Sequence, residues 1–381
     1  MTRLPYGRQT IDEDDIQSVV EALRAPLLTC GPLVAQFEQA LATVTSAPYA
    51  VACSSGTAAL HLAYAALGIG PGDEIITTPI TFSATAAAAY YVGASVRIAD
   101  VDPRTGNLDP RSVESLMTSR TRAIVPVHLA GLPADLDELR MLARSRDVLL
   151  IEDACHALGA TYRGTPIGAG TSDAVVFSFH PVKHVTTGEG GAVVVRNPVV
   201  QQRIMRMRHH GIERDPATAA HAVTELGWNY RLPDFACALG ISQLAKLDRF
   251  IATRRELAGL YRDALAVAFP DGGVLAPVEL TDRVSAYHLY AVAIDFERFA
   301  TTRHDVMRAL AAAGIGTQVH YIPLLQHPLH AQRCPDELRR SRPGADAYFA
   351  HTLSLPLFPA MTAADVTFVV DELRRVLGGS R

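Results

Sequence analysis

The sequence predicts an α/β fold: a large domain with a mostly parallel seven-stranded sheet flanked by helices, and a smaller α+β domain at the C-terminal end. Two observations support this prediction. Between residues 49 and 196, short apolar runs alternate with longer helical segments, which is the pattern of parallel strands joined by helical crossovers. After residue 197 the alternation stops, and a long helical stretch precedes a weaker mixture of strands and helices.

The sheet is predicted from seven apolar runs with helices between them. Strands are expected at 50–53, 74–78, 96–100, 123–127, 148–153, 174–179 and 191–196, and helices at 57–67, 82–92, 110–118 and 134–146. The third helix follows Asp109-Pro110, an N-cap residue followed by a proline at the first helical position. Ligands of parallel sheets bind at the carboxyl ends of the strands, so we expect the functional residues there.

The remaining segments flank this alternating region. An amphipathic helix is expected at 12–24. The C-terminal part is expected to contain a helical region at about 234–267, a strand at 287–294, a helix at 303–313, a strand at 316–321 and a last helix near 362–377, with loops at 213–225 and 326–343. These elements predict a large domain over 1–245 and a small domain over 246–381.

Composition argues against several classes of protein. The formal net charge is −4 with no basic block, so no nucleic-acid partner is expected. No stretch reaches the roughly 18 uncharged apolar residues of a membrane span, and no signal-peptide pattern is visible, so a cytoplasmic protein without a membrane partner is expected. The five cysteines are scattered without a CxxC spacing, which predicts neither a disulfide framework nor a metal site.

Lysine is nearly absent from this chain. Of the 35 basic residues only Lys183 and Lys246 are lysines. Where positive charge alone is needed the chain uses arginine, so a lysine within a motif suggests chemistry that a guanidinium cannot perform, such as Schiff-base formation. Lys246 lies on an amphipathic stretch and is interpreted as a chance survivor. Composition alone does not decide the role of Lys183.

Two motifs follow predicted strands and suit a phosphorylated ring. Ser54-Ser55-Gly56-Thr57 opens a helix, where free backbone N–H groups can bind phosphate, although a simple capped turn is the more common explanation. Asp153 ends the strand 148–153 and could hold a protonated ring nitrogen, with His156 beside a phenolic oxygen. An acid capping a turn and a core histidine would explain either residue taken alone.

The segment from Ser178 to Gly191 places Lys183 between two apolar strands. An amine forms an imine only when unprotonated, and burial or nearby positive charge lowers its pKa. Ser178 can reach a phosphate, and the glycines at 188, 190 and 191 let the backbone pass close to a ligand. This pattern favours a reactive lysine.

Together these residues resemble the DegT/DnrJ/StrS sugar aminotransferases, which are fold-type I pyridoxal-phosphate enzymes. The resemblance rests on SSGTAAL (54–60), EDACHALGA (152–160), SFHPVKHVTTGEGG (178–191) and WNYRL (228–232), and it covers essentially the whole chain. Within the family, the N-terminal PYGRQTIDEDDIQSVVEAL, TTPITFSATA (77–86) and QVHYIPL (318–324) look most similar to the 4-aminotransferase of pseudaminic acid biosynthesis.

The resemblance implies a role for each candidate residue. Lys183 would carry pyridoxal phosphate as a Schiff base and move the proton at the substrate carbon. The other cofactor-binding residues would be Gly56, Thr57 and Ser178 at the phosphate, Asp153 at the ring nitrogen, His156 near the phenolic oxygen, Phe82 on the ring face, and Asn229 of the partner subunit. The sugar nucleotide would contact Tyr6, the turn at 26–29 with Leu28 and Thr29, His180, Gln318, His320 and Tyr321. A shared Asn229 implies a homodimer with shared active sites.

The implied reaction is amination of a nucleotide-linked 4-keto-6-deoxy sugar, expected to be a UDP-linked N-acetylhexosamine, with L-glutamate as donor. A dTDP-linked 3-keto or 4-keto sugar is the alternative. Position 183 is lysine, whereas dehydrating relatives have histidine, which favours transamination. The apolar residues 25–28 depart from the polar or basic substrate loop that the resemblance leads us to expect.

Two other classes of protein with an α/β fold are alternatives. A pyridoxal-phosphate-binding regulator would be expected to carry a preceding DNA-binding module and a higher basic content. A nicotinamide-dependent sugar oxidoreductase would need the GxGxxG fingerprint, which is missing from the turn after the first strand.

Overall fold

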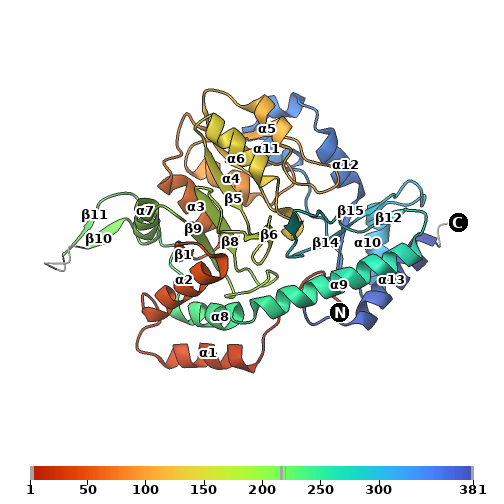
Figure 1. The fold of residues 1–381 in the computed structure, drawn as a ribbon, viewed down its shortest axis with the longest axis horizontal. Helices are drawn as coiled ribbons and strands as arrows, with labels where there is room; N and C mark the ends of the chain where they lie inside the picture. Colours follow the sequence, from red (N-terminus) through yellow and green to blue (C-terminus); the bar gives the residue numbers. More distant parts are fainter. Residues whose placement is uncertain (1–3, 215–217, 219, 379–381) are drawn as a thin grey trace.

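The structure, a computed structural model, describes residues 4–214, 218 and 220–378. A seven-stranded sheet in the order β1-β9-β8-β5-β4-β2-β3 lies at its centre (Figure 1). Its strands are β1 (Tyr49–Cys53), β2 (Glu74–Thr77), β3 (Ser95–Ile98), β4 (Thr121–Val125), β5 (Leu149–Asp153), β8 (Ala174–Ser178) and β9 (Gly191–Val195). β9 is antiparallel to β1 and β8, whereas the other neighbouring pairs are parallel. The predicted seven-stranded, mostly parallel sheet is confirmed.

Helices cover both faces of this sheet. They include α2 (Pro32–Thr45), α3 (Gly56–Ala66), α4 (Ala84–Tyr91), α5 (Pro110–Leu116), α6 (Leu136–Ser145) and α7 (Pro198–Arg208). Side chains alternate along a strand, so Val176 packs into the core beneath α3, while its neighbour Phe177 packs into the core beneath α2. Burial of both faces explains why these strands are continuous apolar runs. The structure also adds α2 and α7, which were not predicted.

The helical region expected at 234–267 is two helices, α8 (Asp234–Leu244) and α9 (Leu247–Ala268). α9 is the long helix that crosses the lower part of the molecule in Figure 1. Its first turns contribute Phe250 to the core of the sheet, and its later turns contribute Tyr261 to a separate C-terminal core. The predicted domain boundary at 245/246 falls where α9 begins, and it stays a prediction.

The C-terminal core is enclosed by a three-stranded antiparallel sheet and two further helices. These are β12 (Val274–Leu275), β14 (Tyr290–Ile294), β15 (Thr352–Leu355), α10 (Arg303–Ala312) and α13 (Ala363–Gly378). A small second sheet consists of β6 (Thr161–Tyr162), β7 (Thr165–Pro166) and β13 (Arg283–Val284). The expected helices at 303–313 and 362–377 and the strand at 287–294 are confirmed. No helix in the described part of the chain is both long and apolar enough to cross a membrane.

The predicted strand at 316–321 is wrong. Gln318 exchanges two backbone hydrogen bonds with Ser354 of β15 (3.2 and 2.9 Å), and these form only an isolated bridge. β15 and β12 occupy the two positions beside β14. The segment 316–321 therefore lies beyond β15 and is not part of the sheet.

Both expected loops contain regular structure. The first holds β10 (Ile212–Arg214) and β11 (His221–Val223), a hairpin that projects from the body in Figure 1; residues 215–217 and 219 lie outside the described chain. The second holds α11 (Pro328–Arg333), a 3-10 turn at Pro335–Arg339 and the start of α12 (Pro343–His351). Arg342 Nε donates to the carbonyl of Ile98 at the end of β3 (3.0 Å), so this segment packs on the large sheet.

The N-terminal helix α1 (Glu13–Arg24) begins with a capping box formed by Asp12 and Asp15. Lys246, at the junction of α8 and α9, forms ion pairs with both carboxylates, and its Nζ lies 2.9 Å from Asp15 Oδ1. Lys246 is therefore a structural ion-pair residue, a role that needs positive charge alone, and its interpretation as a chance survivor stays a prediction. Its ion pairs tie α1 to the junction between α8 and α9.

Candidate active site

The predicted motif residues converge at the carboxyl ends of three parallel strands. Ser54 to Thr57 follow β1, Asp153 ends β5, and Ser178 ends β8. Because β8 and β9 are antiparallel neighbours with Ser178 paired to Gly191, the chain between them returns as a tight loop that carries Lys183. This arrangement brings motifs separated by more than a hundred residues to one edge of the sheet.

Gly56 begins α3 at a point where backbone and side chains from three motifs meet. The Ser55 side chain caps the helix by accepting a hydrogen bond from the Ala58 N–H (3.1 Å). A Cβ on Gly56 would lie 3.0 Å from Ser178 Cβ and 3.2 Å from Cys155 Sγ, so only glycine fits without displacing them. The free N–H groups of the first turn and the Ser178 hydroxyl form a small cradle suited to an anion.

Asp153 presents a buried carboxylate that is bound by neutral donors. Thr85 Oγ1 donates to Asp153 Oδ2 (2.8 Å), and the Cys155 N–H donates to Oδ1 (3.2 Å). Thr81 Oγ1 lies 2.8 Å from Thr85 Oγ1 and extends the chain. No basic side chain of the described residues forms an ion pair with Asp153. A buried carboxylate without a cationic partner is suited to hold a protonated nitrogen.

His156 is buried, and only one of its ring nitrogens has a partner. Its Nε2 lies 3.1 Å from the Tyr321 hydroxyl, whereas its buried Nδ1 makes no hydrogen bond within the described chain. Burial, and secondarily the charge of Lys183, holds the pKa of His156 well below its usual value, so the ring is neutral. When Tyr321 donates to Nε2, the proton of the imidazole is on Nδ1 and is available to an acceptor.

Lys183 is held in a turn in which its N–H donates to the carbonyl of His180 (2.9 Å). Its Nζ lies 3.5 Å from Nε2 of His288. Burial lowers the pKa of Lys183 below its ordinary value, and electrostatic interactions with Cys155 and Asp153 partly offset this effect. A lowered pKa increases the fraction of unprotonated amine, which is the nucleophilic form.

Four aromatic side chains lie next to this centre. The Phe82 ring is 62 % exposed, and its centroid is 6.3 Å from that of Tyr321. His320 Nδ1 lies 2.9 Å from Ser354 Oγ, and the His320 ring lies 5.4 Å from that of Tyr6. Burial lowers the pKa of His320 to about 3, so its ring is neutral. The structure thus places Tyr6, Phe82, His320 and Tyr321 in a chain of ring contacts that ends at His156.

The side chains of four predicted site residues form no hydrogen bond, ion pair or ring contact with this group in the described part of the chain, although the backbone of His180 bonds to Lys183 and Ser178. Leu28 and Thr29 are exposed beside α8, where the Leu28 carbonyl accepts from the N–H of Asp234 (2.9 Å). His180 is exposed, with Nε2 4.0 Å from Glu189 Oε1. Gln318 is exposed, and its Oε1 accepts from the N–H of Val319 (2.9 Å).

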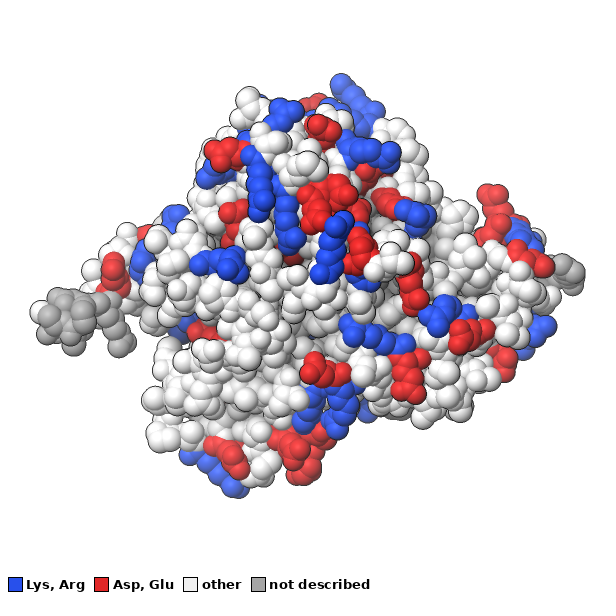
Figure 2. Space-filling view, in the orientation of Figure 1, with Lys and Arg blue, Asp and Glu red and all other residues white. Residues whose placement is uncertain are grey.

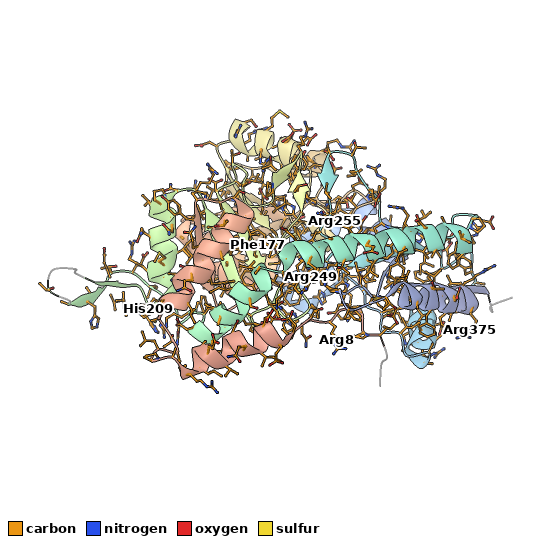
Figure 3. All side chains as sticks on the ribbon, turned by 60° about the horizontal axis from the view of Figure 1, so that its bottom comes forward. Arg8, Phe177, His209, Arg249, Arg255 and Arg375 are labelled. Atoms are coloured by element: carbon orange, nitrogen blue, oxygen red, sulfur yellow. The ribbon has the colours of Figure 1, made fainter. Side chains whose placement is uncertain are left out.

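Asn229 is also exposed, and its segment connects two regions. It forms an isolated bridge with His209, which Figure 3 places toward the end of the molecule that carries β10 and β11. The next residue, Tyr230, accepts from the Ser54 N–H through its carbonyl (2.9 Å). The WNYRL motif therefore lies beside Ser54, just before the anion cradle at Gly56, and Asn229 is exposed at the surface.

Two residues of the centre were missed from the sequence: Thr85, which holds Asp153, and His288, which contacts Lys183. Thr85 lies inside the segment 77–86, whose pattern could have drawn attention to it. His288 lies 105 positions from Lys183 and carries no local signal. Within the described ranges, no group of three or more His, Cys, Asp or Glu side chains is arranged to hold a metal ion.

Comparisons with known proteins point to one family. A model of the DegT/DnrJ/EryC1/StrS aminotransferase family matches residues 9–374. The chain is similar to the spore coat polysaccharide biosynthesis protein SpsC of Bacillus subtilis, with 37% identity over 385 residues, 99% of this chain and 98% of SpsC. It is also similar in structure to PseC of Helicobacter pylori, described as an aminotransferase involved in the biosynthesis of pseudoaminic acid (TM-score 0.92, 30% identity, 99% of each chain).

A third similar protein has been solved with its cofactor in two states. The PLP form of Spr1654 from Streptococcus pneumoniae has a TM-score of 0.90 to this chain, with 28% identity over 99% of each chain. Its PMP form has a TM-score of 0.91, with 27% identity over 100% of each chain. The alternation between pyridoxal and pyridoxamine phosphate is the chemistry of a transaminase.

Proposed function

The chain belongs to the DegT/DnrJ/EryC1/StrS aminotransferase family, and from this premise we propose that it aminates a nucleotide-linked 4-keto-6-deoxy sugar with L-glutamate as donor. It is a pyridoxal-phosphate-dependent sugar aminotransferase. The similarity to PseC supports the expected substrate class, a UDP-linked 4-keto-6-deoxy-N-acetylhexosamine. The similarity to SpsC is consistent with a role in polysaccharide biosynthesis. The expected cytoplasmic location stays a prediction.

The residues of the centre fit pyridoxal phosphate. The cradle at Gly56 offers free N–H groups and the Ser178 hydroxyl to a phosphate. Asp153 offers a buried carboxylate to a protonated ring nitrogen, and the unpartnered Nδ1 of His156 offers a donor to a phenolic oxygen. The convergence of these three features around the amine of Lys183 is the observation that carries the proposal.

Each of these residues has a separate task in the proposed reaction. Thr57 joins Gly56 and Ser178 in binding the phosphate, and Phe82 covers one ring face. When bound, pyridoxal phosphate supplies a conjugated ring that stabilises the negative charge developing on the carbon next to the transferred nitrogen. Asp153 keeps the proton on the ring nitrogen, which the stabilisation requires. Nζ of Lys183 takes a proton from one carbon and returns it to another, first with the amino donor and then with the keto sugar.

The substrate side of the site is proposed to begin at the aromatic chain from Tyr6 to His320 and Tyr321. These rings border the centre and are neutral, so they can contact a sugar without attracting ions. His180 and Gln318 are exposed and available to a larger ligand such as a nucleotide. Within the described residues of one chain, the apolar turn with Leu28 and Thr29 forms no hydrogen bond with the centre, so its proposed role as a nucleotide contact depends on the assembly.

We propose a homodimer in which Asn229 of the partner subunit completes the phosphate site. Apolar side chains that are more than a third exposed lie on α1, on the turn after it and on α8, and include Leu23, Leu27 and Phe235. A hollow of about 590 Å³ lies between these elements. Few charged side chains cover α2 and α8 in Figure 2, in keeping with a surface that is buried in an assembly.

The proposal is tested with the Lys183→Ala variant and a panel of sugars. The variant is expected to lose the absorbance of the lysine-bound cofactor together with amination activity, because both depend on the same Nζ. The wild-type protein, given glutamate and UDP- or dTDP-linked 3-keto and 4-keto sugars, is expected to aminate a UDP-linked 4-keto sugar best, with the product identified by mass spectrometry and NMR. Full activity of Lys183→Ala would refute the role of Lys183, and a preference for a dTDP-linked sugar would refute the substrate.

A further inference from the structure

A histidine outside the motifs lies against the reactive lysine. His288 precedes β14, and its side chain is buried, with 4 % of the residue exposed. Its Nε2 lies 3.5 Å from Nζ of Lys183, at the outer limit of a hydrogen bond. Its Nδ1 is also buried and has no hydrogen-bond partner in the part of the chain that the structure describes. Among the described residues, Lys183 is thus the one hydrogen-bonding contact of this ring.

The backbone around His288 is fixed on two sides. The buried Arg254 of α9 donates through Nη1 to the carbonyls of Tyr287 (3.2 Å), His288 (3.4 Å) and Leu357 (2.9 Å). On the other side, the Leu289 N–H donates to the carbonyl of Ala130 (3.3 Å). These bonds hold the backbone of His288 in place, and ring contacts with His156 and His184 (centroids 4.4 and 5.5 Å away) limit rotation of the buried imidazole away from Lys183.

The neighbouring histidines have other partners. His184 Nε2 lies 3.1 Å from the carbonyl of Ala286, so that nitrogen must carry the proton. His156 uses its Nε2 for Tyr321. Nothing in the described chain except Lys183 determines which nitrogen of His288 carries its proton. His288 can therefore accept from the lysine or donate to it.

All three histidines are neutral. Burial, followed by the charge of Lys183 or of nearby arginine, holds the pKa values of His156, His184 and His288 well below their usual value. A neutral acceptor can orient an amine without the strong preference for the ammonium form that a carboxylate would impose. This suits a lysine that has to be unprotonated to react and that has four rotatable bonds to immobilise.

We propose that His288 is a positioning residue for Lys183: its Nε2 accepts a hydrogen bond from Nζ and holds the amine in place whenever the lysine is not joined to the cofactor. This inference rests on the proposed role of Lys183 as the cofactor-bound lysine. The titratable and charged groups that face the pair are His156, His184 and His320 from three loops, Asp153 and Cys155 at the end of β5, and Arg254 from α9.

The test measures how fast the full-length protein, stripped of its cofactor, forms the lysine-bound species when pyridoxal phosphate is added. The rate constant is followed by absorbance across a range of pH, which gives a midpoint for deprotonation of Lys183 and a plateau for the fully unprotonated amine. His288→Gln places an amide near the position of Nε2, whereas the shorter His288→Asn cannot reach Nζ. Tyr290→Phe is the matched control, because it removes a buried hydroxyl without a partner from the adjoining strand.

The plateau rate of His288→Asn is expected to fall about tenfold, the loss that corresponds to one hydrogen bond, and its midpoint to move to lower pH because the ammonium loses an acceptor. The plateau rate of His288→Gln is expected to stay within about threefold of the wild-type rate, and that of Tyr290→Phe is expected to equal the wild-type rate. A plateau and midpoint unchanged in folded His288→Asn would overturn the inference, as would a Gln variant as slow as the Asn variant. Lys183→Ala separates the two levels, because a lysine-bound band that persists in that variant refutes the proposed function itself.

Discussion

Replacement of Thr85 by valine is a direct test of how the buried carboxylate of Asp153 is held. Thr81, Thr85 and Asp153 form a chain of hydrogen bonds with two separations of 2.8 Å, and Thr85 is fully buried. The single proton of the Thr85 hydroxyl is directed to Asp153 Oδ2, because the alternative acceptors, the Thr81 hydroxyl at 2.8 Å and the Phe82 carbonyl at 3.3 Å, are neutral. Thr85→Val keeps the shape of the side chain and removes the donor.

The magnitude follows from the type of bond that is lost. A hydrogen bond to a buried charged group contributes about 1.5 to 3 kcal/mol. Of its bonds to described residues, the Asp153 carboxylate would retain only the longer one from the Cys155 N–H (3.2 Å). With an unfolding entropy of about 2.1 cal/mol/K per residue, a loss of this size lowers the Tm of a 381-residue chain by about 2 to 4 °C. The same loss, if it falls on the transition state of the reaction, slows the reaction about tenfold or more.

Thr85→Ser is the matched control, because it keeps the hydroxyl that donates to Asp153. It removes a buried methyl group and thereby costs about 1 kcal/mol in stability, so stability and reaction rate must be measured in two separate assays. Calorimetry of the cofactor-free protein measures the change in Tm. Stopped-flow absorbance of the holoenzyme with glutamate measures the half-reaction, in which Thr85→Ser is expected to stay within about threefold of wild type and Thr85→Val to be about tenfold slower. The reasoning is refuted if the valine variant reacts at the wild-type rate, or if serine is as slow as valine.

Three further predictions concern other parts of the site. If Asn229 acts across a dimer, inactive Lys183→Ala and Asn229→Ala proteins that are mixed and allowed to exchange subunits are expected to recover about a quarter of wild-type activity, because half of the dimers are mixed and each has one intact site. No recovery would contradict a shared site. Lys183→Met is expected to stabilise the cofactor-free protein at neutral pH, because the pKa of Lys183 is lowered in the folded protein and the unfolded chain therefore binds the proton more tightly. The gain in the free energy of unfolding, measured with urea, should shrink as the pH approaches about 10.5, and a gain that does not change with pH would contradict this cause. Gly56→Ala should weaken pyridoxal-phosphate binding about tenfold or more with the fold intact, because the new Cβ would lie 3.0 Å from Ser178 Cβ. Fluorescence titration measures the affinity, and an affinity equal to that of the wild type would show that the cradle has room for a methyl group.

The large sheet and its edge residues were predictable because their signals are local. Each strand is buried on both faces, so it appears in the sequence as an apolar run, and Asp153 and Ser178 occur where such runs end. The parallel arrangement then brings those ends together without any further information. The positions of Gly56, Asp153 and the lysine loop at one edge of the sheet follow from this rule, whereas their roles were implied by the family resemblance.

The C-terminal half was less predictable because its contacts are made over long distances in the sequence. The segment 316–321 has the alternation of a strand, but β12 and β15 already occupy the positions beside β14, and only Gln318 forms a bridge. The segment 326–343 has the composition of a loop, yet Arg342 ties it to β3. His288 has no signal near it, because its relation to Lys183 arises only from the way the C-terminal chain packs beside the sheet.

The two lysines show what local sequence could and could not decide. Their rarity marked both of them equally, and only their surroundings separate them. At Lys246, partial burial works against protonation, but the carboxylates of Asp12 and Asp15 raise its pKa, so it is a permanent cation that joins two helices. At Lys183, burial lowers the pKa, and the neutral ring of His288 lies 3.5 Å from Nζ. The same amine is an ion-pair partner beside carboxylates and, in the proposed reaction, a nucleophile beside an uncharged acceptor, so the chemistry of the neighbours favours Lys183 over Lys246 as the reactive lysine.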